Sequence, residues 1–181
     1  MTSATPSMPA GSIEIRPASP GDLSGIHDLA TRVLPPTYVS TGLLEADEIQ
    51  SLIDGFWSPE YFGSVLEGDG LLWIADRAGS VVGVAEVARY GDTDAILWKL
   101  YVATELQGHG LGTRLLAAIG AHLWNGTERW FTEYVTGNHA AAAFYAKHGF
   151  RFDREEPDNR PDVDATYTWC VRDAMTPIGL P

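Results

Sequence analysis

Alternating apolar and polar residues predict a series of short β-strands along this chain. Residues 12–16 place Ile13 and Ile15 on one face. Runs rich in aliphatic and aromatic residues follow, and we expect further strands at 71–76, 81–90, 95–102, 130–135, 150–152 and 165–171. The second, third and fourth strands are joined by short turns, the first of which contains Gly79. Strands connected in this way predict an antiparallel meander.

Apolar side chains at three- and four-residue spacing predict the helices. The first begins at Ser19-Pro20 and ends at Pro35-Pro36, because proline fits the first turn of a helix and disrupts its interior. Residues 38–68 predict one or two short helices, interrupted near Ser58-Pro59. The last two helices are expected at 112–124 and 138–148.

Length and composition indicate one folded domain. A chain of 181 residues, 45% hydrophobic, can bury roughly two thirds of its unfolded surface. We expect a mobile N-terminal tail at 1–11, a domain at 12–175 and a C-terminal tail at 176–181, because the first segment consists of small and polar residues.

The net charge of −12 argues against nucleic acid and against an anionic membrane as partners, and it suits a cationic ligand. The sequence has no apolar run of about 18 residues and no signal-like start, so we expect a soluble cytoplasmic protein. The single Cys170 cannot form an internal disulfide, which agrees with a reducing compartment. The histidines lack metal-ligand spacing, and no metal is expected.

Acidic residues are concentrated between positions 38 and 68. They are Glu45, Asp47, Glu48, Asp54, Glu60 and Glu67. Such a concentration is typical of a solvated helix face, and it would also form a wall that attracts a cation. Both interpretations stay open from the sequence.

Three glycines separate the strand at 95–102 from the helix that follows. Gly108, Gly110 and Gly112 let backbone N–H groups approach an anion, and the helix start adds further donors, so a phosphate is the expected ligand. A P-loop would need Gly-Lys-Ser/Thr at its end, which this chain lacks. A dinucleotide-binding fingerprint would need glycine where the chain has Thr113, which disfavours a dehydrogenase.

The segment Gln107-Gly108-His109-Gly110-Leu111-Gly112 follows the strand that ends in Leu100-Tyr101-Val102. A second segment reads Asn138-His139-Ala140-Ala141-Ala142-Ala143-Phe144-Tyr145, with Gly149-Phe150 after it. Together they resemble the two motifs of the GCN5-related N-acetyltransferases (GNAT). The resemblance implies a single α/β domain with a mixed, mostly antiparallel sheet of six to seven strands flanked by helices. It also implies a splayed strand pair that forms the acetyl-CoA cleft.

The resemblance further implies acetyl-CoA as cosubstrate, with the glycine loop on its pyrophosphate and the preceding strand along its pantetheine arm. The cofactor-binding residues expected on this basis are Leu100, Tyr101, Val102, Gln107, Gly108, His109, Gly110, Leu111, Gly112, Thr113, Asn138, Ala141, Phe144 and Lys147. It implies that Tyr145 protonates the departing thiolate. From the residues alone, Tyr145 also fits a core aromatic and Asn138 a helix N-cap.

The sequence offers two candidates for the general base. Many relatives carry a Glu in the strand at 95–99, and this chain has none there. Glu86 is the first candidate and Glu133 the second, although either also fits a solvated strand residue. His109 stands where relatives often have Lys or Arg, a charge that Arg114 and Lys147 would supply.

We therefore predict an acetyl-CoA-dependent N-acetyltransferase that acts, as a monomer or homodimer, on a primary amine. The Tyr38–Glu48 segment and Phe144-Tyr145 resemble the spermidine/spermine-acetylating branch, which implies a small cationic amine such as a polyamine. A peptide N-terminus and an antibiotic amine stay open as acceptors. The alternative is a catalytically silent coenzyme A-binding sensor or partner-binding module.

Overall fold

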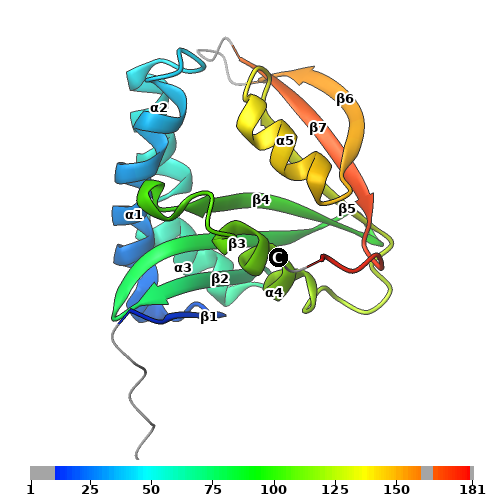
Figure 1. Ribbon diagram of the computed structural model, residues 1–181, viewed down its shortest axis with the longest axis horizontal. Coiled ribbons are helices and arrows are strands. Elements are labelled where there is room, and N and C mark those ends of the chain that lie inside the picture. The colour runs from blue at the N-terminus through cyan, green and yellow to red at the C-terminus, as the bar shows by residue number, and fades with distance from the viewer. Residues whose placement is uncertain (1–10, 160–164, 180–181) are drawn as a thin grey trace, which may run out of the picture.

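The computed structural model describes residues 11–159 and 165–179. These residues form one seven-stranded sheet in the order β1-β2-β3-β4-β5-β7-β6. The strands are β1 (Ile13–Pro17), β2 (Leu71–Arg77), β3 (Ser80–Tyr90), β4 (Asp94–Val102), β5 (Arg129–Val135), β6 (Arg151–Pro157) and β7 (Thr166–Asp173). Only β4 and β5 pair in parallel. The predicted meander and the mixed, mostly antiparallel sheet are confirmed (Figure 1).

Both predicted tails lie partly outside the described residues. Apart from residue 11, the N-terminal tail expected at 1–11 falls outside the described residues, as do the last two residues of the tail expected at 176–181. The tail boundaries therefore stay predictions.

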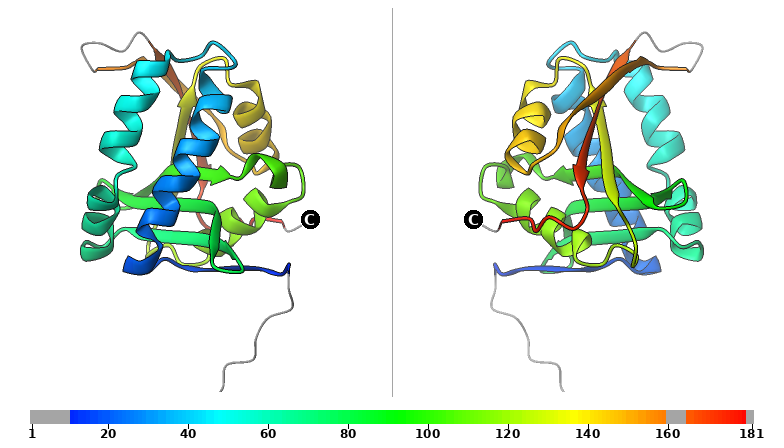
Figure 2. Two further views of the ribbon diagram at one scale, coloured as in Figure 1. Left: turned by 90° about the vertical axis from the view of Figure 1, so that its left-hand side faces the viewer. Right: turned by 90° about the vertical axis from the view of Figure 1, so that its right-hand side faces the viewer.

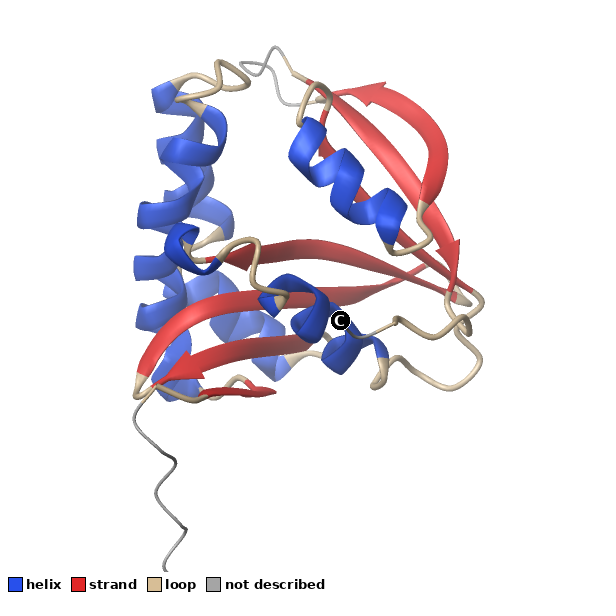
Figure 3. Ribbon diagram, viewed as in Figure 1, coloured by secondary structure: helices blue, strands red, loops and turns tan. Residues whose placement is uncertain are grey.

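Helices cover both faces of this sheet. They are α1 (Leu23–Tyr38), α2 (Ala46–Phe56), α3 (Pro59–Glu67), α4 (Leu111–Gly120) and α5 (His139–Lys147). Figure 2 shows α4 and α5 on one side and α2 and α3 on the other, and Figure 3 shows the same arrangement by type of element. Among the described residues, no helix is long and apolar enough to cross a membrane.

The sheet opens between its two central strands. Residues Asp94–Leu97 of β4 pair with Arg129–Thr132 of β5. The pairing stops there, although β4 continues to Val102 and β5 to Val135. Beyond the paired positions the two strands diverge, with β4 beside β3 and β5 rising with β7 and β6 (Figure 1). This is the splayed strand pair that the resemblance implied.

Two helices end elsewhere than predicted. α1 continues through Pro35 and Pro36, because its last turn buries Tyr38. Because proline has no N–H, Pro35 and Pro36 cannot donate to the carbonyls of Thr31 and Arg32, four residues earlier. Both of these residues are exposed, so water can reach their carbonyls. α4 ends at Gly120, about four residues before the predicted end. Trp130 packs against Gly120 so closely that a Cβ at this position would lie 2.9 Å from its ring.

The sixth strand is longer than predicted. β6 reaches Pro157 and pairs with β7 along its length except at a bulge at Asp153, whereas the sequence pattern predicted only 150–152. Its side chains are nearly all exposed, so it lacks the alternation of buried and exposed positions by which a strand is recognised.

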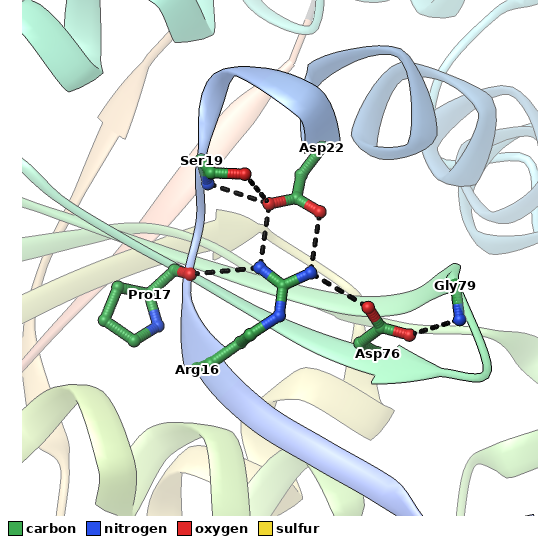
Figure 4. Close-up of polar contacts among 6 residues, drawn as sticks. All are labelled: Arg16, Pro17, Ser19, Asp22, Asp76 and Gly79. Carbon is green, nitrogen blue, oxygen red and sulfur yellow. Dashed lines mark hydrogen bonds and ion pairs between the residues drawn. The ribbon is translucent and has the colours of Figure 1, made fainter. Parts of the chain in front are cut away.

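Arg16 fastens the first strand to its neighbours (Figure 4). Its guanidinium donates to both oxygens of Asp22, at 2.8 and 2.9 Å, and to Asp76 on β2 at 2.9 Å. Asp22 also accepts from the backbone N–H of Ser19, and Asp76 accepts from Gly79 in the β2–β3 turn. This guanidinium holds the pKa of Asp22 well below its usual range. One cation thus joins β1, the start of α1 and a hairpin turn.

Candidate active site

The loop between β4 and α4 is held by its own hydrogen bonds. The side-chain amide of Gln107 donates to the carbonyl of Val102 at 3.1 Å, and His109 Nδ1 lies 2.8 Å from the carbonyl of Gln107. Gly108 and Gly110 have φ of 77° and 78°, a left-handed conformation that glycine adopts without strain. Gly110 is the N-cap of α4, so the free N–H groups of the first helical turn begin at this loop.

The first turn of α4 packs closely on α5. A Cβ at Gly112 would lie 3.3 Å from the ring of Phe144, so glycine allows the two helices to approach. Thr113 points inward and is buried, with its hydroxyl 3.0 Å from His148 Nε2. Only the backbone of Thr113 can therefore serve the loop.

α5 carries the two residues of the second motif to which a role was assigned, Asn138 and Tyr145. The side chain of Asn138 caps the helix by accepting from the backbone N–H of Ala141 at 3.1 Å. Two turns later Tyr145 is buried, stacked on Tyr134 with ring centroids 6.0 Å apart. Burial raises the pKa of Tyr145 to about 12, while a hydrogen bond with Thr132 opposes this rise. The phenol is therefore protonated throughout the neutral range.

Further tyrosines gather near the separation of β4 and β5. The hydroxyls of Tyr38 and Tyr101 lie 2.6 Å apart and join α1 to β4. Burial raises the pKa of both phenols, and the electrostatic neighbours of Tyr38 include Tyr145, Tyr167 and Glu133. These groups come from α1, β4, β5, α5 and β7, so the fold brings distant parts of the chain to one point.

A cavity of about 820 Å³ lies beside this cluster. Nine aromatic residues line it: Tyr38, Phe56, Trp57, Tyr61, Trp98, Tyr101, Tyr134, Tyr167 and Trp169. Its charged lining residues are Lys99, Glu133, Glu156 and Asp158. Glu156 is paired with Arg154 at 2.7 Å. An aromatic surface with carboxylates is suited to a cationic ligand that has an apolar part.

A buried ion pair lies at one wall of this cavity. Lys99 Nζ on β4 is 2.6 Å from Glu86 Oε2 on β3, and Tyr61 donates to the other carboxylate oxygen at 2.6 Å. Lys99 also lies 4.2 Å from the ring centroid of Tyr61 and 5.4 Å from that of Trp57. Lys99 and Tyr61 line the cavity and Glu86 does not. Burial lowers the pKa of Lys99, and the carboxylate of Glu86 opposes this shift.

Comparison with known proteins agrees with this geometry. Residues 68–152 match the family model described as the acetyltransferase (GNAT) domain. They contain β2 to α5, and with them the glycine loop and the Asn138-to-Tyr145 motif. These residues are similar to a GNAT acetyltransferase domain, and the described residues have a GNAT-like α/β fold. The predicted enzyme class, an acetyltransferase, is thereby confirmed.

Solved structures share the fold over most of the chain. The PaiA N-acetyltransferase from Thermoplasma acidophilum, solved in complex with coenzyme A, is 24% identical over 86% of this chain and 98% of its own, with a TM-score of 0.71. An acetyltransferase from Thermus thermophilus is 25% identical over 92% and 99%, with a TM-score of 0.62. The ribosomal-protein-S18-alanine N-acetyltransferase from Escherichia coli is 20% identical over 94% and 99%, with a TM-score of 0.67. No curated protein matches the chain.

Within this GNAT-like domain, most of the predicted cofactor residues lie at the opening between β4 and β5 and at the helix starts beside it. Leu100, Tyr101 and Val102 occupy the part of β4 beyond its pairing with β5, and the loop and Asn138 lie at the starts of α4 and α5. Lys147 lies apart, exposed at the end of α5, where it lines a second cavity of about 440 Å³ with Arg172.

Region 38–68 contributes to the main cavity, but not through the acidic wall that was one of its two interpretations. Its aromatic and aliphatic side chains line the cavity, and its six carboxylates do not. Glu45 and Glu48 form a capping box at the start of α2, and Asp54 accepts from Gln50.

Sequence reasoning missed several cavity residues. Lys99, Tyr61, Trp98 and Trp169 all line the cavity and had no predicted role. A lysine inside an otherwise apolar strand was an available signal for Lys99, because lysine is almost never buried without a partner.

Proposed function

We propose that this protein transfers the acetyl group of acetyl-CoA to a primary amine. The observation that carries the proposal is the position of the aromatic, partly acidic cavity beside the point where β4 and β5 separate. In this arrangement the cofactor enters along the free part of β4 and the amine enters from the cavity, so that the two meet at the tyrosine cluster.

The residues present fit the cofactor. The left-handed glycines and the free N–H groups at the start of α4 suit the pyrophosphate, and the edge of β4 at Leu100 and Tyr101, which β5 does not pair with, suits the pantetheine amides. Acetyl-CoA supplies an activated thioester, which an amine attacks at the carbonyl carbon. A backbone N–H near Val102 would stabilise the oxyanion that forms.

The reacting amine must lose a proton. A primary ammonium has a pKa of about 10.4 and is nearly all charged at neutral pH. Glu133 lines the cavity and is an electrostatic neighbour of Tyr38, whereas Glu86 is tied to Lys99 and Tyr61 outside the lining. These contacts favour Glu133 as the base over Glu86, reversing the order that the sequence suggested.

The departing thiolate must gain a proton. Tyr145 is the proposed acid because it is protonated at neutral pH and belongs to the same hydroxyl cluster. Its hydrogen bond with Thr132 fixes the phenol from the β5 side. A phenol within hydrogen-bond reach of the sulfur can donate its proton to the thiolate as the C–S bond breaks. Because a thiol has a pKa of about 8.5, the thiolate is the weaker base, and the phenolate regains a proton from the product ammonium or from solvent.

A protonated amine is the acceptor class that the charges support. The chain carries a net charge of −12, and Glu133 and Asp158 line the cavity. The polyamine predicted by resemblance belongs to this class and is one candidate.

An acceptor screen with detection of free thiol tests the proposal. We expect release of coenzyme A from acetyl-CoA that depends on added amine and yields the acetylated product by mass spectrometry. A protein that binds coenzyme A by calorimetry, yet releases no thiol with any amine, would be the silent sensor instead.

A further inference from the structure

Two large apolar side chains are exposed where they line the main cavity. Phe56, the last residue of α2, is 50% exposed, and Trp98 on β4 is 40% exposed. Both line the cavity. Exposed rings of this size have a free-energy cost in water, which a ligand that covers them removes.

A bulge in the sheet places Trp98 there. Glu86 pairs with Lys99 and Val87 pairs with Leu97, so Trp98 has no partner in the β3 ladder. Its ring packs edge-on against Trp169 with centroids 6.4 Å apart. Phe56 packs in the same manner against Tyr61, at 5.9 Å. The cavity therefore has one aromatic pair from the helices and one from the sheet.

We propose that the acceptor is a small primary amine that carries an aromatic ring. This inference rests on the proposed function and narrows its acceptor. The ring would pack between the Phe56–Tyr61 and Trp98–Trp169 pairs, and its ammonium would face Glu133.

The charges disfavour an open-chain polyamine by comparison. Of the cavity carboxylates, Glu156 is already paired with Arg154. The charge of Lys99 is likewise compensated by Glu86, so neither pair supplies negative charge for a second ammonium deep in the cavity. One amine on an apolar body matches both the aromatic surface and the limited negative charge.

Acceptors that differ in one feature test the proposal. At saturating acetyl-CoA, we expect kcat/KM for 2-phenylethylamine to exceed that for propylamine and for putrescine by about tenfold or more. Direct binding of 2-phenylethylamine, followed by tryptophan fluorescence, gives a readout that needs no turnover.

Variants connect this preference to the two rings. Phe56→Ala and Trp98→Ala should each lower kcat/KM for 2-phenylethylamine by about tenfold, change that for propylamine much less, and leave the KM for acetyl-CoA unchanged. Phe152→Ala is the matched control, because Phe152 is 67% exposed on β6 and does not line the cavity. Trp98→Phe should restore most of the lost selectivity.

The outcomes separate the two proposals. If putrescine, spermidine or a peptide N-terminus is the best acceptor, the aromatic-amine inference is wrong and the acetyltransferase proposal stands. Equal losses for 2-phenylethylamine and propylamine in the two alanine variants would also overturn the inference. If no amine releases thiol, both proposals fail.

Discussion

Glu86 and Lys99 face each other on β3 and β4 as a buried ion pair, with 2.6 Å between Oε2 and Nζ. Their side chains are only 2% and 7% exposed. Bringing both charges out of water is costly, and each charge depends on the other for compensation. The hydroxyl of Tyr61 adds one hydrogen bond to the carboxylate. The pair is therefore a part of the site on which the folded state itself depends.

Removing one member of this pair should destabilise the fold strongly. Glu86→Gln or Lys99→Met alone leaves an uncompensated buried charge, and we expect each to lower the free energy of unfolding by about 3–5 kcal/mol. The double variant removes both charges and should recover most of that loss. Urea unfolding measures all three. Asp69→Asn is the control, because it breaks the exposed Arg89–Asp69 pair and should change stability by less than about 1 kcal/mol. Additive losses in the double variant would contradict this account.

The glycine loop gives a prediction about charge at the pyrophosphate. Gly110→Asp and Gly110→Asn place side chains of the same shape at the same left-handed position, so their backbone strain is matched. The added carboxylate should weaken acetyl-CoA binding by about tenfold or more relative to Asn. Calorimetry on the two folded variants checks this. Equal affinities would remove the loop from the phosphate site.

A third prediction concerns the phenol of Tyr145. Tyr145→Phe keeps the ring and its packing, and kcat should fall by roughly 10²–10⁴-fold with acetyl-CoA affinity little changed. Since the pKa of Tyr145 is raised to about 12, deprotonation of this acid should not limit wild-type kcat below about pH 11. Tyr134→Phe, which removes the hydroxyl from the ring stacked on Tyr145 and keeps the stacking, is the control and should retain most of its kcat. Wild-type kcat in Tyr145→Phe would make Tyr145 a core residue.

Local patterns made the strands, the glycine loop and the α5 motif predictable. Gly110 caps a helix because of its own conformation, and Asn138 caps α5 through a residue only three positions away. Such features depend on neighbouring residues in the chain, so the sequence displays them directly.

Pairings across the sheet were not predictable in the same way. Glu86 was named as a base, but its partner Lys99 is fixed by the β3–β4 register, and the bulge beside it exposes Trp98. The sequence left open whether the carboxylates of region 38–68 face solvent or the site, and the helices of this region turn aromatic and aliphatic side chains toward the cavity. Both results depend on how elements pack, which no single segment encodes.

The Arg16–Asp22 pair predicts a stability difference that depends on pH. Arg16 lowers the folded-state pKa of Asp22 below its unfolded value of about 3.9, so the stabilisation is present above about pH 4 and is lost as the pH falls further. Arg16→Gln should lower the free energy of unfolding by about 1–2 kcal/mol at pH 7, and this difference should shrink below pH 4. Thermal unfolding across pH measures it. Arg77→Gln removes the same charge from the exposed end of β2 and should show no such dependence.

The last prediction concerns the choice of Glu133 as the base. Without a base, the reaction relies on the small fraction of acceptor that is already a free amine, and this fraction rises tenfold per pH unit until the amine pKa, about 10.4. Glu133→Gln should therefore lower kcat/KM for the amine by roughly 10²–10⁴-fold at pH 7 and make it rise steeply with pH, while acetyl-CoA affinity stays near wild type. Initial rates at several pH values with saturating acetyl-CoA measure this. Glu155→Gln is the matched control, since Glu155 is exposed on β6 and does not line the cavity. If Glu133→Gln keeps the wild-type rate and pH profile, the proton leaves by another route, and Glu86, connected to the cavity through Lys99 and Tyr61, becomes the base to test.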